Sequence, residues 1–411
     1  MLQNLQISLL SLVFISFTVL ALEPSQTLVA PITKDTNTSL YSINLNYVER
    51  YVIDLDATFS GRHFSFQQTL ISCSSPQCSA ARSYSSPQCS PSRNKDANGK
   101  CECVVTPMNP VTRKCDSAKL ASSYLIISLT DGKNPTDTIN FGGFPIASAP
   151  QTLLQSLPEG TTGVVALSRA PLALPTKFSA SHQGLAKRFA LCLPSTENTK
   201  GVVFFGDGPY YFLPREKIDL MGTLAYTPLL KHPKSPEYYI GLKGISINGK
   251  ANYFRRKAFE LDPSGNGGVK ISTIVPYTTL RSDIYRTIVN DYSEAMGGIP
   301  RAMKTGPFEV CVNDRRIGLG VIPFPRVDLE LGNGKNWTIL KPNLIIDMGN
   351  SVGCLAFVDG GKNAKEAMVI GSYQMENHFF LFDLGASMLG FSPPLSFYKT
   401  TCGGFNFTRG A

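Results

Sequence analysis

Few side chains in this sequence are arranged for one of the common kinds of catalysis. No G-x-S-x-G segment precedes an expected helix, and no glycine-rich phosphate loop follows an expected strand. The ten cysteines are even in number, so all are expected to be paired and no free thiol nucleophile is predicted. The four histidines are predicted to be packed or surface residues. They are His63, His182, His232 and His378.

The cysteine content is typical of an exported protein stabilised by disulfide bonds. Six cysteines cluster within residues 73–115, and their possible pairings cannot be separated by sequence. No paired C-x-x-C knuckles occur, so no metal site is predicted. The clustered cysteines are Cys73, Cys78, Cys89, Cys101, Cys103 and Cys115, and the dispersed ones are Cys192, Cys311, Cys354 and Cys402.

Residues 1–21 are predicted to be a secretory signal peptide. A polar start leads into an apolar run over residues 7–22, and Val19 and Ala21 fit a small-residue cleavage site. The run is shorter than the roughly 20 residues of a membrane span. We therefore expect a secreted protein of the apoplast or cell wall, with no membrane partner. Three N-glycosylation sequons fit this expectation. They begin at Asn37, Asn336 and Asn406.

The chain is basic, with a formal net charge of +9 and a pI near 9.0. It contains no Lys/Arg run of the kind that binds nucleic acid, and export also argues against such a partner. A basic exported protein would associate with acidic cell-wall polysaccharide through charge alone. A basic soluble surface with no dedicated partner explains the same charge.

Short apolar or alternating runs bounded by Gly, Pro, Asn and Asp predict an all-β protein. The runs are residues 50–55, 124–129, 201–205, 238–245, 327–331 and 377–382. Helical spacing is rare, with the best candidate at residues 280–295 and a shorter one at 178–182. A chain of 411 residues is long for a single core. A composition break at residues 206–209 predicts two β lobes, residues 22–214 and 215–411.

Seven segments, in order along the chain, resemble one family of plant proteins. They are NPVTR (109–113), VVFFGDGPYYFLP (202–214), YTPLLKHP (226–233), EYYIGLKGISINGK (237–250), ISTIVPYTTLRSDIY (271–285), CLAFVDGG (354–361) and VIGSYQMENHFFLFDLGASMLGFS (369–392). The family is that of the extracellular dermal glycoproteins, with the basic seven-S globulins, the xyloglucan-specific endoglucanase inhibitors and, more distantly, the cereal xylanase inhibitors. The resemblance implies a bilobal pepsin-like aspartic protease fold with a central cleft, few short helices and no cofactor.

An active aspartic protease needs one catalytic aspartate in each lobe, and the pair shares one proton. Each lies in an apolar-apolar-Asp-Thr/Ser-Gly loop, whose glycine lets the backbone turn sharply. The first-lobe match places Asp54 at the catalytic position, but Leu55 replaces the hydroxyl residue and Asp56 replaces the glycine. A carboxylate at Asp56 would also repel that of Asp54. Taking Asp56 as the equivalent residue gives no better match.

The second-lobe match places Ser272 at the aspartate position, and a serine cannot supply the second carboxylate. Ile274 stands at the glycine position. The supporting apolar-apolar-Gly element survives at residues 369–371, whereas its first-lobe counterpart ends in Ala166. These departures predict a protein that is not an enzyme, with Asp54 and Ser272 as vestigial catalytic positions.

Two other segments imitate an aspartate loop. They are residues 345–350, around Asp347, and residues 382–387, around Asp383. The resemblance places the first before Cys354 and the second in a late hairpin. Both are interpreted as turns between strands, in which Asp and Gly are common.

Family members that inhibit glycoside hydrolases insert basic side chains into the enzyme's cleft. The resemblance therefore implies a protein partner, a microbial or plant endoglucanase or xylanase. Lys399 matches one inhibitory arginine position, just before the final T-T-C segment, and Arg315 and Arg316 match a second one loosely. A lysine keeps the positive charge of arginine but loses its planar fork of donors. These residues are also explained as solvated surface charges.

Two alternatives stay open. As in the seven-S globulins, the protein could be a storage or defence glycoprotein that binds a peptide ligand; alternatively, it could be a residual aspartic endopeptidase. The resemblance further implies two long-range disulfides, Cys311 with Cys354 and Cys192 with Cys402. The six clustered cysteines would then pair among themselves.

Overall fold

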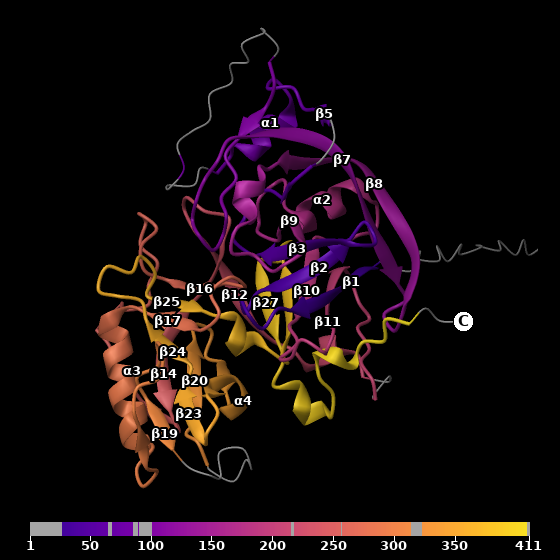
Figure 1. Ribbon diagram of the computed structural model, residues 1–411. Coiled ribbons are helices and arrows are strands. Elements are labelled where there is room, and N and C mark those ends of the chain that lie inside the picture. The colour runs from indigo at the N-terminus through magenta and orange to yellow at the C-terminus, as the bar shows by residue number, and fades with distance from the viewer. Residues whose placement is uncertain are drawn as a thin grey trace, which may run out of the picture.

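The computed structural model describes residues 27–64, 68–84, 89, 101–214, 218–255, 257–313 and 323–408. Within these ranges the chain is built mainly of β-strands, and its helices are few and mostly short (Figure 1). The prediction of an all-β protein is confirmed. The predicted signal peptide at residues 1–21, together with Arg315 and Arg316, lies outside the described residues.

Nineteen of the described strands belong to one extended sheet that runs through both halves of the molecule. Its strands from the first half are β1 (Thr27–Lys34), β2 (Tyr41–Leu45), β3 (Glu49–Asp54), β4 (Gly61–Arg62), β5 (Thr69–Leu70), β6 (Val104–Val105), β7 (Ala118–Thr130), β8 (Pro135–Ser148), β9 (Thr161–Ala166), β10 (Arg188–Cys192) and β11 (Gly201–Gly206). Its later strands are β12 (Ala225–Lys231), β13 (Tyr238–Ile240), β16 (Val269–Ile271), β17 (Thr278–Leu280), β24 (Phe357–Asp359), β25 (Met368–Ile370), β26 (Phe379–Asp383) and β27 (Met388–Phe391).

Two smaller sheets of four strands complete the second half. One contains β14 (Leu242–Ile247), β15 (Lys250–Ala251), β20 (Val327–Leu331) and β21 (Asn336–Ile339), and the other contains β18 (Arg301–Ala302), β19 (Cys311–Asn313), β22 (Ile345–Asp347) and β23 (Val352–Leu355). The α-helices are α1 (Pro76–Ala81), α2 (Leu174–Ser181), α3 (Ser282–Ala295) and α4 (Lys341–Leu344). Each of the six predicted strand runs contains an observed strand, and both predicted helices are present.

The longest helix, α3, forms because its apolar residues return at helical spacing. Ile284, Ile288 and Tyr292 are all buried on the face that packs against the strands. Asp283 lies in the first turn, where a negative charge stabilises the helix. The helix covers the outer side of its lobe (Figure 1).

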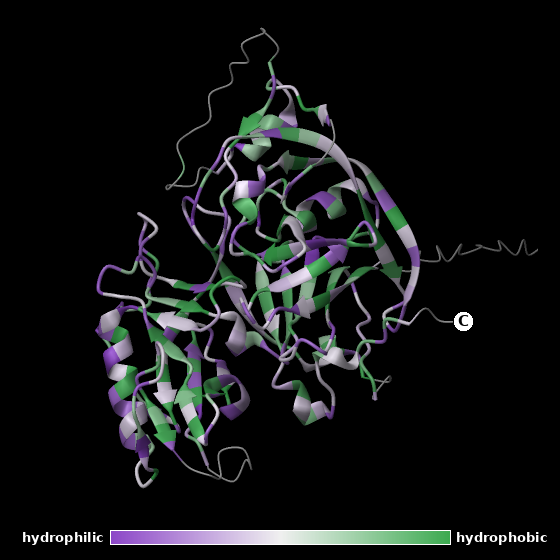
Figure 2. Cartoon of the chain, viewed as in Figure 1, coloured by the Kyte–Doolittle hydropathy of each residue, from purple (hydrophilic) through white to green (hydrophobic). Residues whose placement is uncertain are grey.

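The two halves of the molecule are joined by β-strand pairing and not by surface contact alone. Strand β26 pairs antiparallel with β10, so that Phe382 lies opposite Phe189 and their rings stack at 4.7 Å. Figure 2 shows hydrophobic residues concentrated along these central strands. Because strands from both halves share this sheet, the division of the chain at residues 214/215 stays a prediction.

The structure contains five disulfide bonds. Both long-range bridges implied by the resemblance are present, Cys192–Cys402 and Cys311–Cys354. The clustered cysteines pair among themselves, as Cys73–Cys101, Cys78–Cys103 and Cys89–Cys115.

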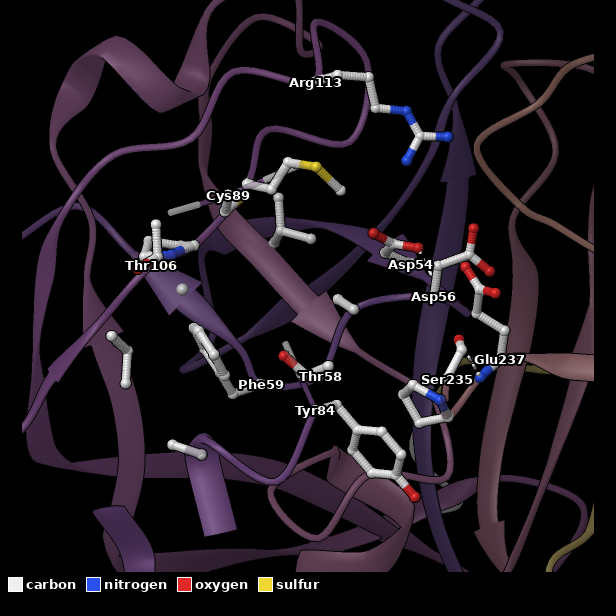
Figure 3. Close-up of a pocket in the computed structure, with 18 of the residues that line it drawn as sticks. Asp54, Asp56, Thr58, Phe59, Tyr84, Cys89, Thr106, Arg113, Ser235 and Glu237 are labelled. Atoms are coloured by element: carbon white, nitrogen blue, oxygen red, sulfur yellow. Dashed lines mark hydrogen bonds between the residues drawn. The ribbon is translucent and has the colours of Figure 1, made fainter. Parts of the chain in front are cut away.

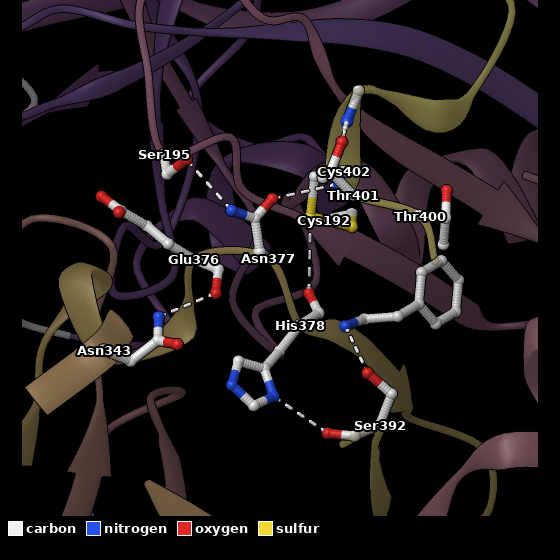
Figure 4. The surroundings of a disulfide bond; sticks show 12 residues. Cys192, Ser195, Asn343, Glu376, Asn377, His378, Ser392, Thr400, Thr401 and Cys402 are labelled. Atoms are coloured by element: carbon white, nitrogen blue, oxygen red, sulfur yellow. Dashed lines mark hydrogen bonds between the residues drawn. A yellow bond between two sulfur atoms is a disulfide. The ribbon is translucent and has the colours of Figure 1, made fainter. Parts of the chain in front are cut away.

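The Cys192–Cys402 bridge ties the C-terminal segment to strand β10 (Figure 4). Both cysteines are fully buried, and the Asn377 side chain accepts a hydrogen bond from the Cys402 backbone N–H at 3.1 Å. The neighbouring His378 ring donates from Nδ1 to the Ser392 carbonyl at 3.0 Å, and burial lowers the pKa of His378 to about 4. His378 is therefore a packed, neutral residue at physiological pH.

The glycosylation sequons lie at the surface. Asn37 and Asn336 are exposed, and Asn406 is partly exposed. No helix within the described ranges is both long enough and apolar enough to cross a lipid bilayer.

We expect loss of the Cys192–Cys402 bridge to destabilise the protein more than loss of a surface bridge. It closes a loop of 210 residues, whereas Cys73–Cys101 closes one of 28, and loop closure limits the unfolded state more when the loop is longer. The double alanine variant at Cys192 and Cys402 should lose about 3–5 kcal/mol of unfolding free energy in urea. An equal or larger loss in the matched Cys73/Cys101 variant would contradict this account.

Candidate functional site

Two parallel strand pairs, one per lobe, hold the residues at the catalytic positions. In the first lobe β3 runs beside β9, with Asp54 opposite Ala166. In the second lobe β16 runs beside β25, and the N–H of Ser272 donates to the Ile370 carbonyl at 3.0 Å. Asp54 and Ser272 therefore lie at the ends of corresponding parallel strand pairs, and their assignment as vestigial catalytic positions stays a prediction.

The two loops are linked directly. The Thr273 hydroxyl donates a buried hydrogen bond of 2.8 Å to the carbonyl of Ile53. The equivalent hydroxyl on the other loop is missing, because Leu55 stands there and is fully buried. One side of the linkage between the lobes is thus a hydrogen bond and the other is apolar packing.

Asp54 is a buried carboxyl group that takes up its proton at much higher pH than an exposed aspartate does. It is 5% exposed, and its Oδ1 accepts the N–H of Asp56 at 2.8 Å. Burial, and to a lesser degree the neighbouring Asp56 carboxylate, raises the pKa of Asp54 to about 7, although Lys270 and Arg113 act in the opposite direction. A single carboxyl of this kind can donate or accept a hydrogen bond near neutral pH.

Ser272, which the sequence match predicts to stand at the position of the second carboxyl, is bonded within its own loop. It is fully buried, and its Oγ accepts the N–H groups of Ile274 at 3.2 Å and Val275 at 3.4 Å. The hydroxyl therefore closes its own turn. It replaces the hydrogen-bond acceptor role of a carboxylate but supplies no partner that could share a proton with Asp54.

A buried lysine, which the sequence analysis did not single out, lies beside this pair of loops. Lys270 is 5% exposed, and its Nζ contacts Asp56 Oδ2 at 2.9 Å and Glu237 Oε1 at 3.1 Å. Burial alone would lower the pKa of Lys270, but the two carboxylates outweigh it and raise the pKa, so the lysine is charged. Burial acts to raise the pKa of Glu237, yet Lys270 holds it below its usual value.

This cluster explains how Asp56 is tolerated at a position that favours glycine. The sequence predicts that the Asp56 carboxylate repels that of Asp54. The charge of Asp56 does contribute to the raised pKa of Asp54. Lys270, from the other lobe, balances it. The feature of the sequence that could have indicated this cluster was a lysine inside a buried strand, Val269–Ile271. Its partners lie 214 and 33 residues away, so spacing could not identify them.

A cavity of about 510 Å³ opens beside these residues. Figure 3 shows Asp54, Asp56 and Glu237 together on one side of it, with Arg113 reaching toward them. Much of the remaining wall is apolar. It includes Phe59, Val105, Met108, Leu153, Leu154 and Val164. An apolar pocket with a few convergent polar groups is typical of a small-molecule or peptide site.

The two aspartates that imitate a catalytic loop lie elsewhere. Asp347 ends β22 and is exposed, and its carboxylate accepts the N–H of Gly349 at 2.9 Å. Asp383 ends β26, pairs with Arg188 at 2.8 Å and caps the turn to β27 by accepting the N–H of Ala386 at 2.8 Å. Each serves a local turn, as expected.

Lys399 lies outside the cavity, on an exposed turn near the C-terminus. It follows the short helical turn Leu395–Tyr398, has a left-handed φ of 55°, and donates its N–H to Ser396 at 3.0 Å. The side chain of Phe397 on the same turn is 63% exposed, a feature that the sequence analysis missed. The turn is fixed by Leu395, which is fully buried.

Residues 54–207 match the family described as xylanase inhibitor N-terminal, and residues 237–393 match xylanase inhibitor C-terminal. The chain belongs to this family. The prediction of a bilobal pepsin-like fold in the group of dermal glycoproteins and seven-S globulins is thereby confirmed.

Individual relatives agree with the assignment. The chain is 35% identical to "Probable aspartic proteinase GIP2" of Nicotiana benthamiana, over 98% of this chain and 97% of the relative. It is also 35% identical to "Chitinase CLP" of Oryza sativa subsp. japonica, over 93% of this chain and 92% of the relative. The crystal structure of edgp matches with a TM-score of 0.85 and 32% identity, covering 94% of this chain and 98% of that one.

We expect the Asp54→Asn variant to change how stability depends on pH. Because the pKa of Asp54 is raised from its usual value near 4 to about 7, the folded state binds more protons than the unfolded state between these values. Stability therefore falls as pH rises through this window. Asparagine removes the penalty, so the gain in unfolding free energy should grow from pH 4 to pH 7.5, by up to about 4 kcal/mol.

The control for this measurement is Asp137→Asn, because Asp137 is exposed. Urea unfolding at several pH values gives the difference between each variant and the parent protein. A difference for Asp54→Asn that stays constant with pH would show that the carboxyl is ionised throughout.

Removal of the buried lysine should be costly. Lys270→Met leaves Asp56 and Glu237 buried without their counter-charge, and breaking such a pair costs about 3–5 kcal/mol. The exposed pair Lys257–Glu260 offers a matched control, for which Lys257→Met should change stability by less than about 1 kcal/mol. Adding Asp56→Asn and Glu237→Gln to Lys270→Met should recover part of the loss. A lack of recovery would contradict the electrostatic explanation.

Proposed function

We propose that this protein is a secreted, non-proteolytic member of its family that binds and inhibits a cell-wall-degrading glycoside hydrolase. The observation that carries the proposal concerns Ser272. Proteolysis by this fold needs a second carboxyl group at that position, whereas the buried Ser272 hydroxyl accepts hydrogen bonds from its own turn. The Lys270 ammonium next to Asp56 is a further difference from an active aspartic protease. It holds a permanent positive charge beside the loop, whereas proteolysis needs a proton that moves between two carboxyl groups.

Without a pair of catalytic carboxyl groups, the pepsin-like fold of this protein would serve to bind a partner. Glycoside hydrolases carry two catalytic carboxyls about 5–9.5 Å apart. A basic side chain placed between them blocks the substrate and stays charge-balanced. The turn that carries Lys399 also presents the exposed ring of Phe397. A cation next to an aromatic ring suits a cleft that binds sugars and contains carboxylates.

Secretion to the apoplast or cell wall and glycosylation at Asn37, Asn336 and Asn406 are part of the proposal. The surface positions of the three asparagines and the five disulfides support both. Arg315 and Arg316 remain proposed contacts from a second loop.

The test is a titration of the disulfide-bonded protein into a xyloglucan-hydrolysing endoglucanase and into a xylanase. We expect stoichiometric inhibition of one of them. Lys399→Ala should weaken inhibition about tenfold or more, whereas Lys399→Arg should strengthen it, because a guanidinium binds a carboxylate with two parallel hydrogen bonds. Lys335→Ala, at another exposed lysine, is the control. Unchanged activity of every hydrolase tested, with the fold intact, would refute the proposal.

The second candidate is a storage or defence glycoprotein that binds a peptide in the cleft. The cavity beside Asp54, with its apolar wall and its buried carboxyls, favours it specifically. Saturable peptide binding that is lost on filling the cavity, for example in Val164→Phe, and no effect on hydrolases would support this role. Acid-dependent cleavage of a denatured protein substrate, abolished in Asp54→Asn, would instead reveal a residual endopeptidase.

A further inference from the structure

A second hollow, an open groove of about 840 Å³, lies on the second lobe and shares no lining residue with the cavity beside Asp54. It is formed by the start of α3 and by the segment before β16. We call it the α3 groove. Five basic residues line it: Arg255, Lys257, Arg281, Arg286 and Lys362. Three acidic residues line it as well: Glu260, Asp262 and Asp283.

The acidic residues of the α3 groove are occupied by local contacts. Glu260 pairs with Lys257 at 3.2 Å, and Asp283 pairs with Arg281 at 2.7 Å. Asp262 accepts the backbone N–H of Asn266 at 2.8 Å. Two of the five cations are thereby paired, and Asp262 keeps its negative charge within a hydrogen-bonded turn.

The other three cations, Arg255, Arg286 and Lys362, are exposed and form no ion pair within the described residues. The Ser282 hydroxyl lowers the pKa of Asp359, and Arg286 contributes to lowering that pKa to a smaller degree. Asp359 already accepts hydrogen bonds from Ser282 at 2.7 Å and Gly361 at 2.8 Å. Three positive charges therefore face one groove with little compensation.

The chain segment that carries Arg255 also carries an exposed aromatic ring. Tyr253 is 93% exposed and lies two residues before Arg255. Its neighbours fix the backbone on both sides, because the Asn252 side chain donates to Asp291 on α3 and the Phe254 ring packs against Phe259 at 5.1 Å. The tyrosine ring is thus held in solvent by an anchored segment.

We propose that the α3 groove binds an acidic polysaccharide, a chain of uronic acid residues. Its carboxylates would pair with Arg255, Arg286 and Lys362, and the Tyr253 ring would stack on the C–H face of a sugar. The three cations come from three separate segments along an open groove, which fits a repeating anionic chain better than a single small anion. This site is independent of the proposed hydrolase inhibition, and would hold the protein in the wall while leaving the Lys399 turn free.

The test measures the affinity of an unesterified galacturonate decamer by calorimetry, with its fully methyl-esterified counterpart as the neutral probe. The triple variant Arg255→Gln, Arg286→Gln, Lys362→Gln should bind the acidic chain about tenfold or more weakly, and salt should weaken the parent's binding. The matched control Lys114→Gln, Lys200→Gln, Lys335→Gln removes the same net charge from exposed lysines elsewhere. It should weaken binding by less than about twofold.

Tyr253→Ala tests the sugar-specific part of the proposal and should weaken binding about threefold or more at both low and high salt, because stacking does not depend on charge.

Circular dichroism and thermal unfolding establish that each variant is folded. Equal losses in the two triple variants would show adhesion by net charge and overturn the proposal. A loss in the groove triple variant without any effect of Tyr253→Ala would show that the groove attracts anions by charge without stacking on a sugar, and would also overturn the proposal. Hydrolase inhibition should be unchanged in all these variants, so the two proposals fail separately.

Discussion

Three ionised groups lie buried where the two lobes meet, and the cleft keeps its present form because they balance one another. Lys270 comes from a strand of the second lobe, and Asp56 comes from the loop after β3 in the first. Neither charge could remain buried alone, since removing an ion from water costs several kcal/mol that only a close counter-ion restores. Together with Glu237, they make the interface between the lobes an electrostatic contact as well as an apolar one.

The same contact is incompatible with the chemistry for which the fold is known. A pair of aspartates works by sharing one proton and holding a water between equivalent carboxyls. If Ser272 stands at the second aspartate position, as proposed, Asp54 has no partner carboxyl, since the Ser272 hydroxyl accepts a hydrogen bond from its own turn; Lys270 Nζ lies beside Asp56. The parallel strand pairs β3–β9 and β16–β25 still hold the two loops in corresponding places. The geometry of the scaffold is thus kept while its reactive groups are replaced by stabilising ones.

Both proposed binding surfaces lie outside the cavity beside Asp54. The Lys399 turn combines a cation with the exposed Phe397 ring. The α3 groove has three cations without an ion pair among the described residues, and the exposed Tyr253 ring lies two residues before one of them. In both places a buried anchor holds the backbone, Leu395 in the first and Phe254 with its neighbour Phe259 in the second. Rigid presentation lowers the conformational entropy that binding would otherwise cost, which is why these two places suit recognition.

Much of the molecule follows from the sequence by itself. Alternating apolar runs located strands such as β11 and β20, helical spacing located α3, and the ordered family segments indicated the fold, the two long-range disulfides and the positions of Asp54 and Ser272. These features depend on local periodicity or on a family pattern. The tertiary structure alone decided that Lys270 pairs with Asp56, that burial raises the pKa of Asp54, and that Arg255, Arg286 and Lys362 face one groove. Such effects arise from charges brought together across long stretches of chain in a medium of low polarity, and no spacing along the sequence encodes that distance or that burial.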